Sequence, residues 1–390
     1  MGASHTPHER SPNSARPRWR TTCDAAGVKF VFHSFEGRYS DNPRALYEAL
    51  RIRGGAHEHV WLADPAHLAA FPPDVVTAGY GTSAGREALE AADVLIANTH
   101  TDVAWAKRNG ALYLQTWHGT PLKRIHWDVL WAPPGRLERL SGDVARWDRL
   151  ISPNATSTPL LRGAFHYDGT VFESGYPRND VLNAPGRDEL RAAARAELGI
   201  ADDRTVVLYA PTWRDDEVFD DGGRDFRLAF DVDAFTERLG EDHVLLLRLH
   251  YMLTGRLEAV EHPAVRDVSF HPDISRLYLA ADVLVTDYSS TMFDFAVTGR
   301  PILFFTYDLP NYQTRVRGFY FGLAGVAPGP LLDTTEDVLD ALRDLDTVAE
   351  RHAEPYARFR ERFCHLEDGH AAERVLDRLF DELDGPRVRR

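Results

Sequence analysis

Short apolar runs alternate with amphipathic stretches from about residue 28 to the end of this 390-residue chain. Because this alternation is typical of strand–helix–strand units with parallel strands, it predicts an α/β fold. The expected strands form two series, and the second begins after Gly175. They are Val28–His33, His59–Leu62, Asp93–Ala97 and Ala111–Gln115, then Thr205–Tyr209, His243–Leu247, Asp282–Thr286 and Ile302–Phe305.

The two series predict two doubly wound Rossmann-type domains that face a central cleft, since a chain of this length exceeds one ordinary core. We place a polar, flexible tail at residues 1–27, the first domain at 28–173 and the second at 174–366. Five apolar residues share one helical face between Ala371 and Leu383, so residues 367–385 are expected to form a C-terminal helix. Ligands of such sheets bind beyond the carboxyl ends of the strands, which directs the search for function to those ends.

Composition narrows the function classes. The formal net charge of −14 argues against a nucleic-acid partner. Cys23 and Cys364 are two isolated thiols, which suits a reducing compartment and excludes a metal site built from cysteines. The apolar runs are too short to cross a bilayer, and the first residues lack the apolar stretch of a secretion signal. We therefore expect a protein that stays inside the cell.

The segment from Asp282 to Pro301 indicates a phosphate site. A buried strand ends at Asp287, and the hydroxyl residues Ser289, Ser290 and Thr291 then open a predicted helix. The free N–H groups and the positive dipole end of a helix favour a phosphate there. Serine capping without any ligand is the alternative, but three hydroxyls at a strand end favour the phosphate interpretation.

Two further strand ends in the second domain carry cations. Thr212 and Arg214 follow the strand Thr205–Tyr209, and a guanidinium is a planar donor suited to phosphate. Arg248 and His250 close the next strand in the same way. A surface turn with a solvated arginine is an equally good interpretation of the first of these segments.

In the first domain, the strand Ala111–Gln115 leads to His118 and Gly119. Glycine permits a sharp turn, which we expect to leave the imidazole exposed at the sheet edge. An imidazole takes up a proton near neutral pH, and Lys123 would help to hold an anionic substrate. A histidine beside a glycine is nevertheless more often structural than catalytic.

Several other patterns have structural interpretations. Gly79–Ala84 matches the dinucleotide fingerprint, but it lies well inside the domain and is expected to be a structural loop. Asp231 and Asp273 precede predicted helices and are expected to cap them. Asn42 is expected to cap a helix that runs to Arg53, with Pro43 at its first position.

Together these segments resemble the CDP-glycerol glycerophosphotransferase family, which comprises teichoic-acid primases and polymerases. The resemblance covers roughly residues 28–380, and the block Trp117–Lys123 is its most specific part. The matching segments are Tyr39–Tyr47, Gln115–Lys123, Gly175–Asp180, Tyr209–Arg214, Arg248–His250, Asp287–Ser290, Arg317–Tyr320 and Asp368–Arg374.

The resemblance implies a GT-B-like fold with an acceptor-binding first domain, a CDP-donor-binding second domain and a last helix that returns to the first domain. It implies transfer of an alcohol phosphate, foremost glycerol phosphate, from a CDP-alcohol to a hydroxyl of a lipid-linked or polymeric cell-wall acceptor, with release of CMP. The expected location is the cytoplasm, peripheral to the inner face of the plasma membrane. No metal or other cofactor is expected.

By motif, the resemblance makes His118 the general base and His250 a second essential imidazole near the donor phosphates. The implied donor contacts are Thr212, Arg214, Arg248, Asp287, Ser289, Ser290 and Thr291, and the implied acceptor-side residues are Gly119, Thr120 and Lys123. His33 stands where glutamate is usual in the family, and Tyr251 follows His250 where proline is common. Because such departures affect contacts outside the phosphates, a CDP-ribitol donor stays open. A glycosyltransferase that uses a nucleotide-sugar donor can share this architecture and is the first alternative. A binding subunit that kept the fold without activity is the second, and the presence of His118, His250 and Ser289 argues against it, as does Arg214.

Overall fold

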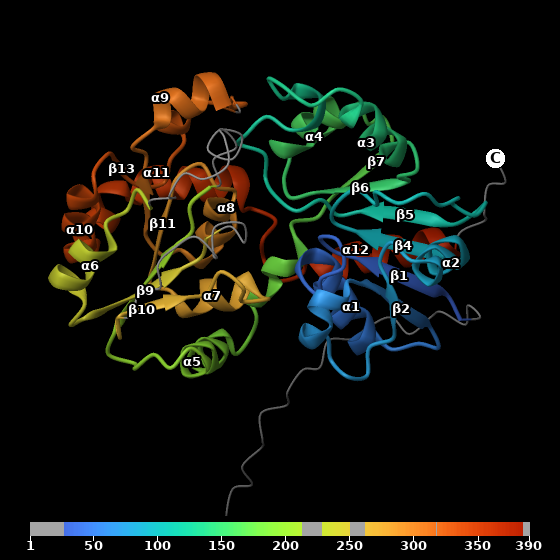
Figure 1. The fold of residues 1–390 in the computed structure, drawn as a ribbon, viewed down its shortest axis with the longest axis horizontal. Helices are drawn as coiled ribbons and strands as arrows, with labels where there is room; N and C mark the ends of the chain where they lie inside the picture. The colour runs from blue at the N-terminus through green and yellow to red at the C-terminus, as the bar shows by residue number, and fades with distance from the viewer. Residues whose placement is uncertain (1–26, 213–227, 250–261, 317, 385–390) are drawn as a thin grey trace, which may run out of the picture.

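The computed structural model describes residues 27–212, 228–249, 262–316 and 318–384. The predicted tail, except for Gly27, lies outside the described residues. Arg214 and His250 also lie outside them. Figure 1 shows two lobes side by side, each built on one sheet.

The first lobe contains a sheet of seven parallel strands in the order β3-β2-β1-β4-β5-β6-β7. Its central strands read as continuous apolar runs because both faces are covered by helices. The strands are β1 (Lys29–His33), β2 (Glu58–Ala63), β3 (Thr77–Gly79), β4 (Val94–Ala97), β5 (Leu112–Gln115), β6 (Arg149–Ser152) and β7 (Thr170–Glu173). The helices are α1 (Asp41–Arg53), α2 (Ser83–Ala91), α3 (Arg136–Val144) and α4 (Ser157–Phe165).

The second lobe repeats this design with six parallel strands in the order β10-β9-β8-β11-β12-β13. Its strands are β8 (Thr205–Tyr209), β9 (His243–Leu247), β10 (Val265–Asp267), β11 (Val283–Thr286), β12 (Ile302–Phe305) and β13 (Leu331–Leu332). Its helices are α5 (Arg187–Glu197), α6 (Val232–Leu239), α7 (Ile274–Ala280), α8 (Thr291–Phe295), α9 (Leu309–Asn311), α10 (Thr335–Arg343) and α11 (Leu345–Phe363). The prediction of two doubly wound α/β sheets is confirmed.

Helix α12 (Ala371–Asp384) follows the second lobe in the sequence but packs on the first. Its apolar face contributes Val375, Leu379 and Phe380 to the core around β1. Ion pairs between Arg53 and Asp377 and between Arg149 and Glu382 fasten it at the surface. Figure 1 shows this red helix among the blue strands of the first lobe. The chain therefore crosses between the lobes twice, while the exact domain bounds stay a prediction.

The start of α1 differs from the sequence prediction. Asn42 was expected to be the N-cap, but the helix begins at Asp41 and its N-cap is Ser40, which makes no side-chain capping bond. The amide of Asn42 instead donates to the carbonyl oxygen of Trp117, 3.1 Å away. A tertiary contact with the first-lobe loop thus takes the side chain that local sequence would have used as a cap.

The other local predictions agree with the structure. Asp231 and Asp273 cap α6 and α7 by accepting backbone N–H bonds. Gly79–Ala84 joins β3 to α2, and Thr82 caps the helix by accepting a bond from Gly85 N, so this segment is a structural loop. Among the described residues, no helix is both long and apolar enough to cross a membrane.

Candidate active site

Both sheets reverse their strand order, and polar loops follow the strands at the two reversal points. The reversal falls between β1 and β4 in the first sheet and between β8 and β11 in the second. Thr212 follows β8, and the segment Asp287–Thr291 follows β11. His118 follows β5, which pairs with β4. Since ligands of doubly wound folds bind outside the carboxyl ends of the strands at the reversal, these loops are the candidate site.

The loops of the two lobes meet directly. A Cβ atom placed on Gly119 would lie 3.0 Å from the Oγ atom of Ser290 and 3.3 Å from its Cβ atom. Nearby, Nζ of Lys123 donates to Oγ1 of Thr212 at 3.5 Å, and Lys123 forms a backbone bridge with Phe319. The predicted acceptor-side and donor-side segments therefore face each other across one junction, although about 170 residues separate them in the sequence.

The imidazole of His118 is held in one tautomer. Its Nδ1 atom lies 2.7 Å from the backbone carbonyl oxygen of Asn98. Because a carbonyl oxygen only accepts, Nδ1 carries the proton and Nε2 keeps a lone pair. Burial lowers the pKa of His118 below its ordinary value, with the Asn98 carbonyl opposing that effect. The neutral, basic form therefore predominates at neutral pH.

The backbone around His118 corrects the expected role of Gly119. The left-handed residue of this turn is Trp117, with φ of 52°, and Gly119 is not among the positive-φ glycines. The ring of His118 is partly buried rather than exposed and packs edge-on against Phe35, with 5.2 Å between ring centroids. A Cβ atom at 119 would crowd the side chain of Ser290, which would have to shift by a few tenths of an ångström, so glycine serves a close approach here rather than a turn.

The hydroxyl segment opens α8 without conventional capping. Ser290 is the N-cap residue, yet its side chain makes no capping hydrogen bond. The hydroxyl of Ser289 accepts from the backbone N–H of Thr291 at 3.4 Å, and the hydroxyls of Thr291 and Thr286 lie 3.3 Å apart. Gly299, with φ of 76°, ends the helical segment. Ser289, Ser290 and Thr291 are all partly exposed.

Asp287 and Arg248 both bind backbone groups. The buried carboxylate of Asp287 accepts two hydrogen bonds from the backbone N–H of Thr212, at 2.8 and 3.0 Å, and so joins the loops after β8 and β11. Nη1 of Arg248 donates to three backbone carbonyl oxygens between Val268 and His271. These bonds shape the loops of the candidate site, whereas contact of either side chain with the donor stays a prediction.

Thr120 is buried in the same loop as His118. Arg214 and His250 lie outside the described residues, so their roles stay predictions.

Asn98 was not singled out from the sequence, although it directly follows β4 and its position at a strand end was a usable signal. The described residues contain no cluster of three or more histidine, cysteine or acidic side chains suited to a metal, and the expected absence of a cofactor stays a prediction.

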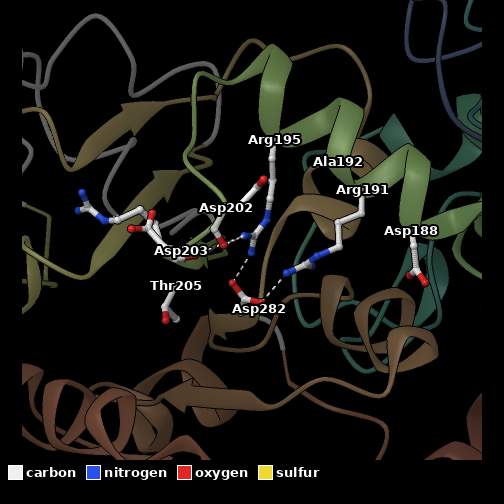
Figure 2. Close-up of a pocket in the computed structure, with 9 residues that line it drawn as sticks. Asp188, Arg191, Ala192, Arg195, Asp202, Asp203, Thr205 and Asp282 are labelled. Atoms are coloured by element: carbon white, nitrogen blue, oxygen red, sulfur yellow. Dashed lines mark hydrogen bonds and ion pairs between the residues drawn. The ribbon is translucent and has the colours of Figure 1, made fainter.

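A pocket of about 550 Å³ lies elsewhere, at the amino ends of β8 and β11. Figure 2 shows Arg191 and Arg195 of α5 pointing at Asp282, and both donate to its carboxylate. Arg195 also donates to the backbone carbonyl oxygen of Ala280. Because these charges satisfy one another, the pocket is held together by its own ion pairs and lies at the wrong sheet edge for the candidate site.

Comparison with known proteins places the chain in a family. Residues 19–381 match the family described as CDP-Glycerol:Poly(glycerophosphate) glycerophosphotransferase. The chain belongs to this family. It is 40% identical to the teichoic acid glycerol-phosphate transferase of Staphylococcus aureus, over 90% of this chain and 92% of that protein. The resemblance noted in the sequence is confirmed, and so is the enzyme class.

Longer members and a solved structure extend this comparison. This chain is 36% identical to the teichoic acid poly(glycerol phosphate) polymerase of Bacillus subtilis, over 90% of this chain but 48% of that protein. The solved structure of the wall teichoic acid polymerase TagF superposes with a TM-score of 0.84 at 35% identity, covering 91% of this chain and 89% of the other. The GT-B-like fold that the resemblance implied is confirmed.

Proposed function

We propose that this glycerophosphotransferase transfers glycerol phosphate from CDP-glycerol to a hydroxyl of a polymeric teichoic-acid acceptor and releases CMP. The observation that carries the proposal is the direct approach of the His118–Gly119 loop to Ser290, because it unites a candidate base with a candidate phosphate cradle. The relatives support the donor and the acceptor. They are glycerol-phosphate transferases and polymerases, and one TagF variant was soaked with CDPG.

The reaction needs a base on one side of the junction. The acceptor oxygen attacks the β-phosphorus of CDP-glycerol in line, and the bond between that phosphorus and the bridging oxygen breaks as CMP leaves. Nε2 of His118 takes the acceptor proton, because Nδ1 is committed to the Asn98 carbonyl. The protein does little covalent work in such a transfer, so positioning and charge stabilisation supply most of the rate.

The donor side holds the phosphates. The hydroxyls of Ser289 and Ser290 lie before α8, at the reversal point of the second sheet, and would donate to the diphosphate. The first N–H groups of α8 already donate to Ser289 and Ser290, so the hydroxyls are the proposed donors. Thr212 and Lys123 lie at the same junction, and the ammonium group of Lys123 would neutralise part of the diphosphate charge. Arg214 and His250 are assigned to this side by motif and complete the proposal.

We also propose that the acceptor is lipid-linked and that the enzyme contacts the membrane surface through the first lobe. Leu130 and Trp131 are 52% and 70% exposed, and Arg136 and Arg139 follow at the start of α3. Tryptophan favours the bilayer interface and arginine favours anionic lipids. Co-sedimentation with phosphatidylglycerol vesicles tests this: Trp131→Ser should weaken binding, and equal binding by both proteins contradicts the contact.

A donor screen tests the reaction. Purified protein is incubated with CDP-glycerol, CDP-ribitol or a UDP-sugar and a glycerol-phosphate oligomer as acceptor, and CMP, UDP and elongated product are measured. We expect CMP and an acceptor longer by one or more glycerol-phosphate units from CDP-glycerol alone. Efficient use of CDP-ribitol would change the alcohol, and UDP release from a UDP-sugar would replace the proposal with glycosyl transfer. Tight CDP binding without any turnover would instead indicate a binding subunit.

A further inference from the structure

A buried arginine joins the two lobes close to the candidate site. Arg178 lies in the short helix Pro177–Leu182 that connects the sheets, and its side chain is 4% exposed. Nη1 donates to both carboxylate oxygens of Asp41 at 3.2 and 3.3 Å, and Nη2 donates to both oxygens of Asp294 at 2.9 and 3.0 Å. Asp41 begins α1 of the first lobe and Asp294 lies in α8 of the second, so one guanidinium bridges the lobes.

The same bridge reaches the loop of His118. The side-chain oxygen of Asn42 accepts from the backbone N–H of Arg178 at 3.2 Å, and its amide donates to the carbonyl oxygen of Trp117 at 3.1 Å. Trp117 directly precedes His118 and has the left-handed φ of the turn. Asn42 is fully buried, so these hydrogen bonds form without competition from water.

A continuous polar path thus runs between the two halves of the site. It leads from the carbonyl of Trp117 through Asn42 to Arg178 and then to Asp294, which lies in α8 four residues after Ser290. Burial alone would lower the pKa of Arg178, but the carboxylates of Asp294 and Asp41 raise it above its ordinary value, so the guanidinium stays charged. Stacking on the ring of Tyr176, 4.3 Å from its centroid, fixes the plane of that group.

We propose that Arg178, with Asn42 and Asp294, is a positioning element that sets the separation between the imidazole of His118 and the hydroxyl segment of α8. The proposal deepens the proposed function and rests on it for its kinetic consequence. A planar guanidinium suits this task, because its two terminal nitrogens each bind one carboxylate and so hold the two carboxylates at a fixed angle. None of the three side chains needs to touch substrate.

Arg178→Lys tests the bridge while it keeps the charge. An ammonium group cannot bind both carboxylates side by side, so the two loops lose their fixed spacing. Misplacement of reacting groups by about 1 Å costs on the order of 100-fold, so we expect kcat to fall about 10–100-fold while the Kd for CDP changes less than about threefold. Asn42→Ala should act in the same direction with a smaller loss. Proportional losses of CDP affinity and kcat, or unchanged kcat in both variants, would overturn the proposal.

Ser275→Ala is the matched control. Its hydroxyl donates to the carbonyl oxygen of Arg178 at 3.1 Å and is buried, but it belongs to α7 of the second lobe and takes no part in the path to Trp117. We expect wild-type kcat from this variant even if its melting temperature falls. If Ser275→Ala lost as much kcat as Arg178→Lys, Arg178 would have only a general structural role and the proposal would be wrong.

A disulfide cross-link between positions 119 and 290 reports their separation independently of catalysis. A Cβ atom built on Gly119 lies 3.3 Å from the Cβ atom of Ser290, so a small shift of either loop brings the pair into the ~3.5–4.5 Å range of disulfides. A protein with Gly119→Cys and Ser290→Cys should therefore cross-link under mild oxidation, as measured by mass spectrometry of the linked peptides. Adding Arg178→Lys should lower the yield at a fixed time severalfold, and an equal yield contradicts the positioning role. If CDP-glycerol gives no CMP with the wild type, the proposed function fails, while this measurement still decides the role of Arg178.

Discussion

Polar side chains lie at both edges of the second sheet, but they pair with each other at one edge and face the other lobe at the opposite edge. At the amino edge, Arg191 and Arg195 of the same lobe both form ion pairs with Asp282, so these charges are already paired (Figure 2). At the carboxyl edge, the Ser290 side chain makes no cap bond and faces Gly119 of the other lobe. A concave polar surface is therefore a weak sign of function when its charges are already paired. Polar groups from two lobes that meet at one junction indicate a functional site more strongly, because they contribute little to the stability of the fold.

The largest effect that would sharpen this contrast is expected from His118→Ala. Losing a general base should lower kcat by ~10²–10⁴-fold. Since the residue belongs to the acceptor side, the Kd for CDP should stay within a few-fold, which calorimetric titration measures. His166→Ala is the control, because His166 is an exposed histidine of the same lobe. A comparable loss of CDP binding in His118→Ala would contradict the two-sided site.

Asp282→Asn should affect stability and leave catalysis unchanged. The amide cannot neutralise Arg191 and Arg195, and Arg195 is only 6% exposed, so the loss should be about 2–3 kcal/mol of unfolding free energy. Denaturant titration measures the loss, and kcat is compared well below the melting temperature. A selective loss of kcat with normal stability would give the amino edge a functional role and break the contrast.

Ser290→Ala should weaken donor binding. A hydroxyl that binds a phosphate oxygen contributes about 1.5 kcal/mol or somewhat more, so the Kd for CDP should rise about tenfold. Thr298→Ala is a suitable control, because Thr298 ends the same helical segment and its hydroxyl donates to the carbonyl oxygen of Phe295. Unchanged CDP affinity in Ser290→Ala would remove this hydroxyl from the phosphate cradle.

The smallest expected effect concerns pH. Burial lowers the pKa of His118 from its ordinary value of 6.5, so the neutral base predominates at pH 7. Activity should then be lost only as pH falls through this lowered pKa, which places the acid limb of kcat/KM below pH 6.5. The profile should be recorded with fluorescence as a check on folding at each pH. An acid limb above neutrality would mean that another group, or a charged imidazole, controls the rate.

Local features were predictable where neighbouring residues decide them. Continuous apolar runs located eight strands, whereas the sequence analysis did not predict β3, β6, β7, β10 and β13 at or near the sheet edges. Asp231 and Asp273 could be identified as caps because an N-cap needs only the next helical turn. Asn42 was misassigned for the complementary reason. Its side chain bonds to Trp117, which lies 75 residues away, and no local pattern reports that contact.

The candidate site divides in the same way. Sequence indicated that His118 and the segment Ser289–Thr291 each end a strand, and the family motifs suggested their roles. The tautomer of His118 depends on the Asn98 carbonyl, which a backbone at a neighbouring strand end supplies. Glycine at 119 permits a close approach to Ser290 rather than a sharp turn.

The sequence by itself determined the α/β class, the number of sheets, the family and the chemistry of the loops, because periodicity and motif are short-range properties of the chain. Only the tertiary structure decided which loops meet, how His118 is protonated and that Arg178 bridges Asp41 and Asp294. Those facts depend on how two separately built lobes pack on each other. Packing joins residues more than a hundred positions apart, and no local preference of the chain encodes such a distance.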